Sequence, residues 1–133
     1  MSTTAAKCDA HETAVCNTAR GTTLTAWTPF LSLHSADPTE TGETAEVNGT
    51  NCPGYVRQAI TFGPPTDGVM TNSAAVTFPT ASGDWVAVTH HTICQDSTGA
   101  TARRYRCQLD APKTVLNGDY LQFPIGSISV SET

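Results

Sequence analysis

The chain has 133 residues, a net charge of −5 and a charged fraction of 14%. This length suits one domain with a real hydrophobic core and is too short for two. A nucleic-acid-binding surface needs clustered Lys and Arg, and the one basic cluster here is Arg103–Arg106, which we interpret as a solvated strand end. The composition therefore argues against DNA or RNA as a partner.

The chain also shows no sign of membrane insertion or secretion. No stretch approaches the roughly 18 to 20 apolar residues of a membrane span, and residues 1–15 lack the apolar core of a secretory signal. We therefore expect no membrane partner, and we expect synthesis and release in a cytoplasm. Five cysteines are unusual in that setting, because cytosolic thiols normally stay reduced.

Residues Cys8 to Arg20 carry the one credible helix, because Ala, Glu and Arg favour helix and Gly21 suits the left-handed turn that ends one. From Leu24 onward, short runs of Val, Ile, Thr and aromatics alternate with Gly, Pro, Asn and Asp clusters, which is typical of an all-β sandwich or barrel. We therefore predict an N-terminal arm over residues 1–23 and a β-domain over residues 24–133. The predicted strands are Pro29–His34, Tyr55–Phe62, Met70–Phe78, Trp85–Cys94, Ala102–Asp110 and Leu121–Val130.

The second predicted strand shows a noisy two-residue alternation, which fits strands covered on both faces, as when subunits pack together. Between the first two strands lies a loop dense in turn formers, Asp37–Gly54. We interpret this loop as a projecting surface that contacts the next subunit. Its predicted contact residues are Asp37, Glu46, Asn48, Tyr55 and Arg57.

Polar residues near this loop raise the question of catalysis. A hydrolase would need a nucleophile and base such as Ser32, His34 and Asp37, but the chain has no G-x-S-x-G motif. The carboxylates sit singly among Thr and Gly, so nothing holds two of them as an acid and base pair. These carboxylates are Glu40, Glu43 and Glu46. We predict no catalytic residue, no enzymatic activity and no cofactor.

The sequence H-H-x-x-C at His90, His91 and Cys94 resembles half of a metal site. On a strand, His90 and Cys94 would share a face while His91 points away. A zinc site needs about four converging ligands, and no second pair of matching spacing exists. We predict no metal and interpret these histidines as packed at a subunit contact or satisfied by the backbone.

The cysteines carry the most distinctive local chemistry. Cys94 and Cys107 flank the turn Asp96–Gly99, and a hairpin closing near Gly99–Thr101 would place them opposite each other, close enough for an intrachain disulfide. Because five is odd, at least one remaining thiol lacks an intrachain partner and is a candidate for an intermolecular bond. The remaining thiols are Cys8, Cys16 and Cys52, and the alternative is that all five are buried and reduced.

Several segments in order resemble a family of small tailed-bacteriophage virion proteins, described as tail-fibre-like proteins or as minor head or capsid decoration proteins. The matching segments are LSLHSADPTETG at Leu31–Gly42, EVNG at Glu46–Gly49, GYVRQAITFG at Gly54–Gly63, TNSAAVTFPTASGDWVAVTHHTI at Thr71–Ile93 and NGDYLQFPIGSISV at Asn117–Val130. The resemblance covers about Leu24 to Ser131. The insert around Cys52 and the number of cysteines depart from the family. The resemblance implies a β-sandwich, which we expect to be jelly-roll-like, and it brings no catalytic residues.

We therefore expect a structural virion protein, first as a capsid decoration or collar protein of the head and neck. The alternative is a tail-fibre or minor tail module that binds host carbohydrate through Trp27, Tyr55 and Trp85, although core packing is the favoured interpretation of these aromatics. Expected partners are copies of itself, as a trimer held by an exchanged arm of about Met1–Thr23, and the major capsid, neck or tail proteins. Assembly is expected in the host bacterial cytoplasm.

Overall fold

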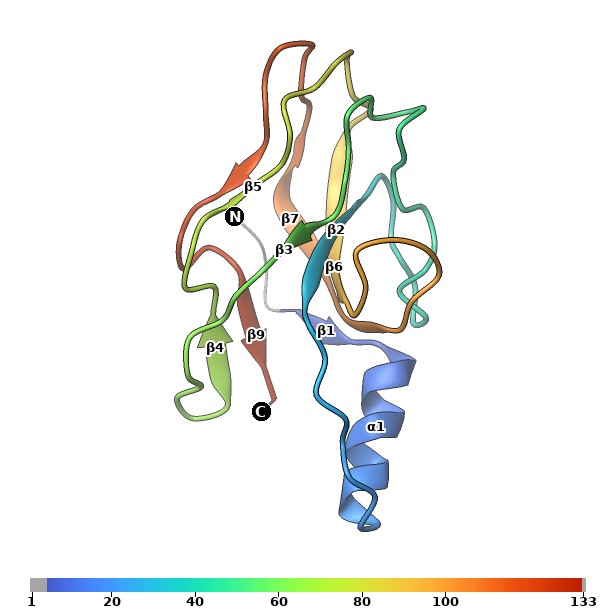
Figure 1. Cartoon of the computed structure of the whole chain (residues 1–133), viewed down its shortest axis with the longest axis vertical. Coiled ribbons are helices and arrows are strands. Elements are labelled where there is room, and N and C mark those ends of the chain that lie inside the picture. The colour runs from blue at the N-terminus through green and yellow to red at the C-terminus, as the bar shows by residue number, and fades with distance from the viewer. Residues whose placement is uncertain (1–4, 133) are drawn as a thin grey trace.

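The computed structural model describes residues 5–132, and it shows a β-protein with one short helix (Figure 1). Helix α1 spans Asp9–Ala19. The strands are β1 Ala6–Lys7, β2 Phe30–His34, β3 Gln58–Ala59, β4 Val69–Thr71, β5 Val76–Thr77, β6 Val88–Cys94, β7 Arg103–Lys113, β8 Gln122–Phe123 and β9 Ser129–Ser131. The predicted all-β class with a short N-terminal helix is confirmed. Among residues 5–132, no helix has the length and apolar character needed to cross a membrane.

One antiparallel sheet forms the body of the molecule, with the strand order β1-β7-β6-β2-β3. Two further pairs, β4 with β9 and β5 with β8, form separate two-stranded ribbons. A jelly roll divides its strands between two substantial sheets. The structure does not confirm the jelly-roll-like arrangement, because one five-stranded sheet faces two small ribbons.

Two predicted strands, Met70–Phe78 and Leu121–Val130, are each divided in two, and the buried side chain of Asn72 bonds to the backbone in both gaps. The Asn72 amide donates to the carbonyls of Ala74 and Pro124, both at 2.9 Å, and its Oδ1 accepts from the backbone N–H of Ile128 at 2.9 Å. These bonds replace strand pairing where both segments bend. Sequence alternation cannot reveal this interruption, because Pro124 and Ile128, which bond to Asn72, lie more than fifty positions away along the chain.

The end of α1 follows the predicted turn chemistry. Gly21 has a φ of +92°, a conformation that glycine adopts without the strain of a Cβ atom. Its N–H donates to Thr18 O, and the N–H of Thr22 donates to Asn17 O. This pair of bonds is the Schellman motif, in which the turn satisfies carbonyls that the helix leaves unpaired. The predicted helix and its end at Gly21 are confirmed.

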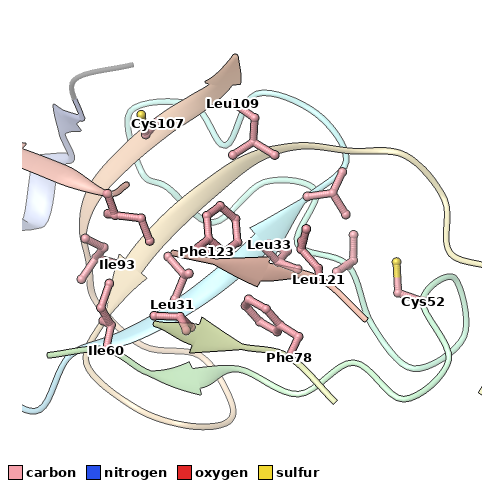
Figure 2. Close-up of a cluster of buried hydrophobic side chains, with 14 of the residues drawn as sticks. Leu31, Leu33, Cys52, Ile60, Phe78, Ile93, Cys107, Leu109, Leu121 and Phe123 are labelled. Carbon is pink, nitrogen blue, oxygen red and sulfur yellow. The ribbon is translucent and has the colours of Figure 1, made fainter. Parts of the chain in front are cut away.

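The hydrophobic core lies between one face of the large sheet and the two ribbons (Figure 2). Leu31 and Leu33 of β2 and Ile93 of β6 are at most 1% exposed and meet Phe78 and Phe123 from the other side. Burial of each such side chain contributes about 1.5 to 3 kcal/mol. Because the core takes alternate residues of each strand, the residues between them point to the opposite face of the sheet.

That opposite face is covered by the chain itself. The first part of the connection between β2 and β3, residues 35–46, lies on the side of the sheet away from β5 and β8 (Figure 1), whereas Val47 and Cys52 in its second part belong to the core. Glu46 forms an isolated bridge with His34, and the N–H of Val47 donates to Leu33 O at 3.0 Å. Around β2 both faces of the sheet are therefore covered, one by the core and the other by this loop. In Tyr55–Phe62, the strand whose alternation led to the expectation of cover on both faces, Val56, Ala59 and Thr61 are exposed.

Candidate functional site

The most developed cluster of polar side chains lies between the sheet and this covering loop. We call it the Glu46 network, and it comprises Ser32, His34, Glu46, Tyr55, Arg57, Thr92 and Arg103. Alternation along the strands places its sheet residues on the non-core face, and the covering loop supplies its carboxylate. Ser32, His34 and Thr92 are completely buried, so each must find its hydrogen-bond partners inside the protein.

The loop reaches the sheet through tight turns and one close approach. The Asp37 carboxylate accepts from the N–H of Thr39, and Asn48 Oδ1 accepts from the N–H of Thr50. Gly42 has a φ of +74°, and a Cβ there would lie 2.5 Å from Arg103 Cβ and 2.8 Å from Cys8 Sγ. Only glycine therefore allows the loop to lie this close to β7.

The hydrogen bonds of His34 define its tautomer. Its Nδ1 lies 2.7 Å from Thr44 O, and because a carbonyl only accepts, Nδ1 carries the proton. Nε2 therefore accepts from the Thr92 hydroxyl at 3.0 Å, and Ser32 donates to Thr92 Oγ1 at 2.5 Å. Burial lowers the pKa of His34 to about 4, so the ring is neutral at physiological pH.

Glu46 is the central acceptor of the network. Arg57 donates to both of its oxygens at 2.8 Å, Arg103 Nη2 donates at 2.7 Å and the Tyr55 hydroxyl donates at 2.8 Å. Burial by itself raises the pKa of Glu46, but the hydrogen bonds from Arg57, Arg103 and Tyr55 outweigh it and lower the pKa to about 2. Glu46 is therefore ionised and fully engaged inside the protein.

Arg57 extends the network to the loop between β6 and β7. Its Nη1 donates to Asp96 O at 3.1 Å and its Nη2 donates to Gly99 O at 2.8 Å. The same guanidinium thus binds the covering loop through Glu46 and the hairpin loop through two carbonyls. The network therefore joins the sheet, the covering loop and the loop between β6 and β7, which are distant in sequence. Its role is structural.

The network has no catalytic geometry. Ser32 Oγ bonds to Thr92 and Arg103 rather than to His34, so no base is positioned to remove its proton. Ser32 is also completely buried. The sequence triad of Ser32, His34 and Asp37 is not brought together, because Asp37 lies exposed near Arg106 at 3.8 Å.

The five predicted contact residues of the loop fall into two groups. Asp37 and Asn48 are exposed, whereas Glu46, Tyr55 and Arg57 are directed into the Glu46 network. The loop therefore does not project as expected, because its carboxylate compensates buried guanidinium groups. Asp37 and Asn48 remain as predicted contact residues.

The predicted position of Cys94 opposite Cys107 is wrong. The strand register pairs Cys94 with Arg103 and Cys107 with His91. Cys107 packs in the core, whereas Cys94 Sγ lies 3.5 Å from Phe30 O on the other face. A disulfide needs Cα atoms within about 7 Å and converging Cβ atoms, which this register does not provide.

Within residues 5–132, none of the five cysteines forms a disulfide, and Cys16 is the exposed one. Cys8 and Cys52 are completely buried, which corrects the expectation that Cys52 lies on a projecting surface. Burial raises the pKa of Cys8 to about 11 and also raises the pKa of Cys52. Both thiols are therefore protonated and unreactive in the folded chain.

The histidine pair behaves as the strand alternation predicts. His91 faces the core beside Phe123, with ring centroids 5.9 Å apart, while His90 lies on the other face and contacts the Thr89 hydroxyl at 2.8 Å. Within residues 5–132, the one cluster with ligand atoms close enough for a metal is Asp9, Glu12 and Glu40. This cluster is exposed and contains none of the H-H-x-x-C residues.

We expected the basic cluster Arg103–Arg106 to be a solvated strand end, and the structure shows that this expectation is wrong. Arg103 is 4% exposed and Arg104 is 8% exposed. Arg103 bonds to Glu46, and the Arg104 guanidinium lies 5.2 Å from the centre of the Trp27 ring. Their partners come from loops that sequence alone does not place beside β7.

Two of the aromatics considered for sugar binding are part of the protein interior. Trp85 is 3% exposed and its indole N–H donates to Pro53 O at 2.8 Å. The Tyr55 ring lies between Trp85 and Phe78, with centroid distances of 6.3 and 6.0 Å. Trp27 is partly buried and packs against the core. The favoured interpretation as core packing is confirmed, and stacking of a sugar on Trp85 is excluded by its burial.

A protein-family model described as podophage GP4 fiber I protein gp80 matches residues 6–131 of the chain. The chain belongs to this family. No curated protein matches it significantly. Membership in the fiber I protein family confirms the resemblance to small phage virion proteins, and it supports a non-enzymatic component of the virion.

Sequence reasoning missed Thr92 and Arg103 as parts of the network. A signal was present, because Ser32 and His34 are the alternate polar positions of the otherwise apolar β2, and Thr92 of β6 lies opposite Ser32. Polar residues at alternate positions usually indicate a solvated face. Here the same pattern marks a buried polar layer, because the covering loop lies over this face of the sheet.

Proposed function

We propose that the chain is a non-enzymatic structural subunit of a podophage fibre. The observation that carries this proposal is the family match over residues 6–131, whose description names a fibre protein. The Glu46 network supports it, because its ionised and hydroxyl groups bond to one another. The function of these groups is to hold loops in place on the sheet.

The sequence analysis placed a head decoration or collar protein first, and the family description moves the fibre to first place. A head or neck location is the second candidate, because residues 5–132 form a small β-structure in which no extended shaft is seen. Gold-labelled antibody on purified particles, combined with copy number, separates the two locations. A fibre subunit is expected at tail-side projections in tens of copies, whereas label over the shell and on the order of hundreds of copies would refute it.

The surface charge supports assembly with other virion proteins. Three of the cationic side chains, Arg57, Arg103 and Arg104, are buried. The chain carries 12 acidic residues against seven Lys and Arg, so the exposed surface is more acidic than the net charge of −5 indicates. Such a surface favours a basic partner surface and disfavours phosphate-rich ligands. Pull-down of capsid, neck and tail proteins with the purified chain would identify this partner.

We propose that covalent cross-linking between copies uses Cys16. It is the exposed thiol, and two Cys16 thiolates from adjacent copies would form a disulfide as dioxygen accepts two electrons and the protons. Assembly in the host cytoplasm keeps the thiol reduced until lysis. Particles on a non-reducing gel are expected to show a dimer that Cys16→Ser removes and Cys52→Ser retains. Migration only as monomer would refute the cross-link.

A further inference from the structure

The N-terminal arm, defined here as residues 5–22, is attached to the body at one end. Ala6 and Lys7 pair with Arg106 and Tyr105 of β7, and the N–H of Cys8 donates to Arg104 O at 2.9 Å. Among residues 5–132, the hydrogen bonds and ion pairs that join arm and body arise from Ala6 to His11. The rest of α1 has no such bond to the body.

The last described residue of the chain completes this attachment. Glu132 accepts from His11 Nε2 at 2.5 Å and from the Tyr105 hydroxyl, and it forms an ion pair with Lys7 at 3.0 Å. Tyr105 also lies beside His11, with ring centroids 4.6 Å apart. We call these four residues the clasp. It holds β1 and the first turn of α1 against β7.

Helix α1 gains little stability from burial. Of its eleven residues, His11 is the one that is buried, and Val15 is 41% exposed. An isolated helix of this length is marginal in water. The docked end with its clasp is therefore the main attachment of the arm, and the remainder of α1 extends away from the sheet (Figure 1).

The chain reverses at the far tip of α1 and returns to β2 through an exposed connection (Figure 1). Residues 20–26 are all exposed, and within the described chain no hydrogen bond is found for residues 23–26. The connection meets the body at Trp27, which packs on the core and under Arg104. The helix is about 17 Å long, so rotation about this connection would move β1 by up to about twice that length.

We propose that the arm of one copy docks on β7 and Glu132 of a neighbouring copy, so that adjacent subunits of the assembly exchange arms. The site fits a second copy because it is seen occupied by this same sequence, through backbone pairing and the clasp. Exchange of the arm preserves every one of these contacts and changes only the path of residues 20–26. Such an exchange of identical elements is a low-cost route to oligomers. The proposal rests on the proposed virion role, which places many copies side by side.

The clasp offers a direct test. Lys7 Nζ lies 3.0 Å from Glu132 Oε2. A water-soluble carbodiimide would join this amine and carboxylate as an amide, and the reagent would take up the water that is eliminated and become a urea. Equal amounts of ¹⁴N and ¹⁵N full-length chain are unfolded together, refolded at high concentration and cross-linked. Peptides that join residue 7 to residue 132 are then analysed by mass spectrometry. Exchange predicts that about half of them carry mixed labels.

The proposal would be overturned if both halves of every linked peptide carried the same label. It would also be overturned if Lys7 did not couple with Glu132. Glu132→Gln is expected to remove this peptide, whereas Glu12→Gln, which changes an exposed carboxylate on the arm, is expected to keep it. A chain beginning at Thr22 is expected to sediment as a monomer, and an intact oligomer would contradict arm exchange. None of these results depends on where the protein lies in the virion.

Discussion

Replacing Glu46 by Gln tests whether the buried charge of the network holds the covering loop on the sheet. Gln keeps the shape of the side chain but removes the charge that Arg57 and Arg103 bind. The pKa of Glu46 is lowered from 4.5 to about 2, which corresponds to about 3 kcal/mol in favour of the ionised form. We expect Glu46→Gln to lower the free energy of unfolding by about that amount at pH 7, and the melting temperature by about 10 °C.

The matched control is Glu43→Gln, an exposed carboxylate of the same loop, which should change stability by less than about 0.5 kcal/mol. Urea unfolding followed by tryptophan fluorescence measures both variants, because Trp85 is buried in the folded chain. A group with a lowered pKa stabilises above its unfolded value and loses that effect as the pH falls towards its folded value. The deficit of Glu46→Gln should therefore shrink below pH 4.5, and equal stability of the two variants at pH 7 would refute the reasoning.

Three further predictions concern other parts of the chain. Gly42→Ala is expected to destabilise by several kcal/mol, because a Cβ would lie 2.5 Å from Arg103 Cβ at a positive φ, whereas Gly49→Ala, with open space, should stay near wild type in the same urea assay. Burial lowers the pKa of His91 to about 3, so its stabilising effect is complete above about pH 6.5 and is lost as the pH falls towards 3. Between pH 6.5 and 4.5 the wild type should lose about 2 kcal/mol more than His91→Leu, and parallel pH profiles would contradict this. A thiol reagent should modify one thiol per native chain and none in Cys16→Ser, and faster labelling of the other cysteines would show that they are accessible.

The sequence by itself determined the class of elements and the chemistry of their ends. Turn residues and short β-branched runs predicted an all-β chain with a helix that ends at Gly21, because these signals depend on the backbone preferences of neighbouring residues. The ordered segments also identified the phage virion family. The same local signals could not show that Asn72 bonds to the backbone in the gaps of two divided strands, since Pro124 and Ile128 are distant from it in the chain.

Only the tertiary structure decided which polar residues are buried together. Arg103 and Glu46 read as solvated charges in sequence, and Cys94 and Cys107 read as a cross-strand pair. The hairpin register instead places His91 opposite Cys107 and Arg103 opposite Cys94, and the covering loop brings Glu46 to Arg103 across 57 positions. Register and loop placement follow from the balance of core packing and compensated charge over the whole domain, and no short stretch of sequence contains that balance.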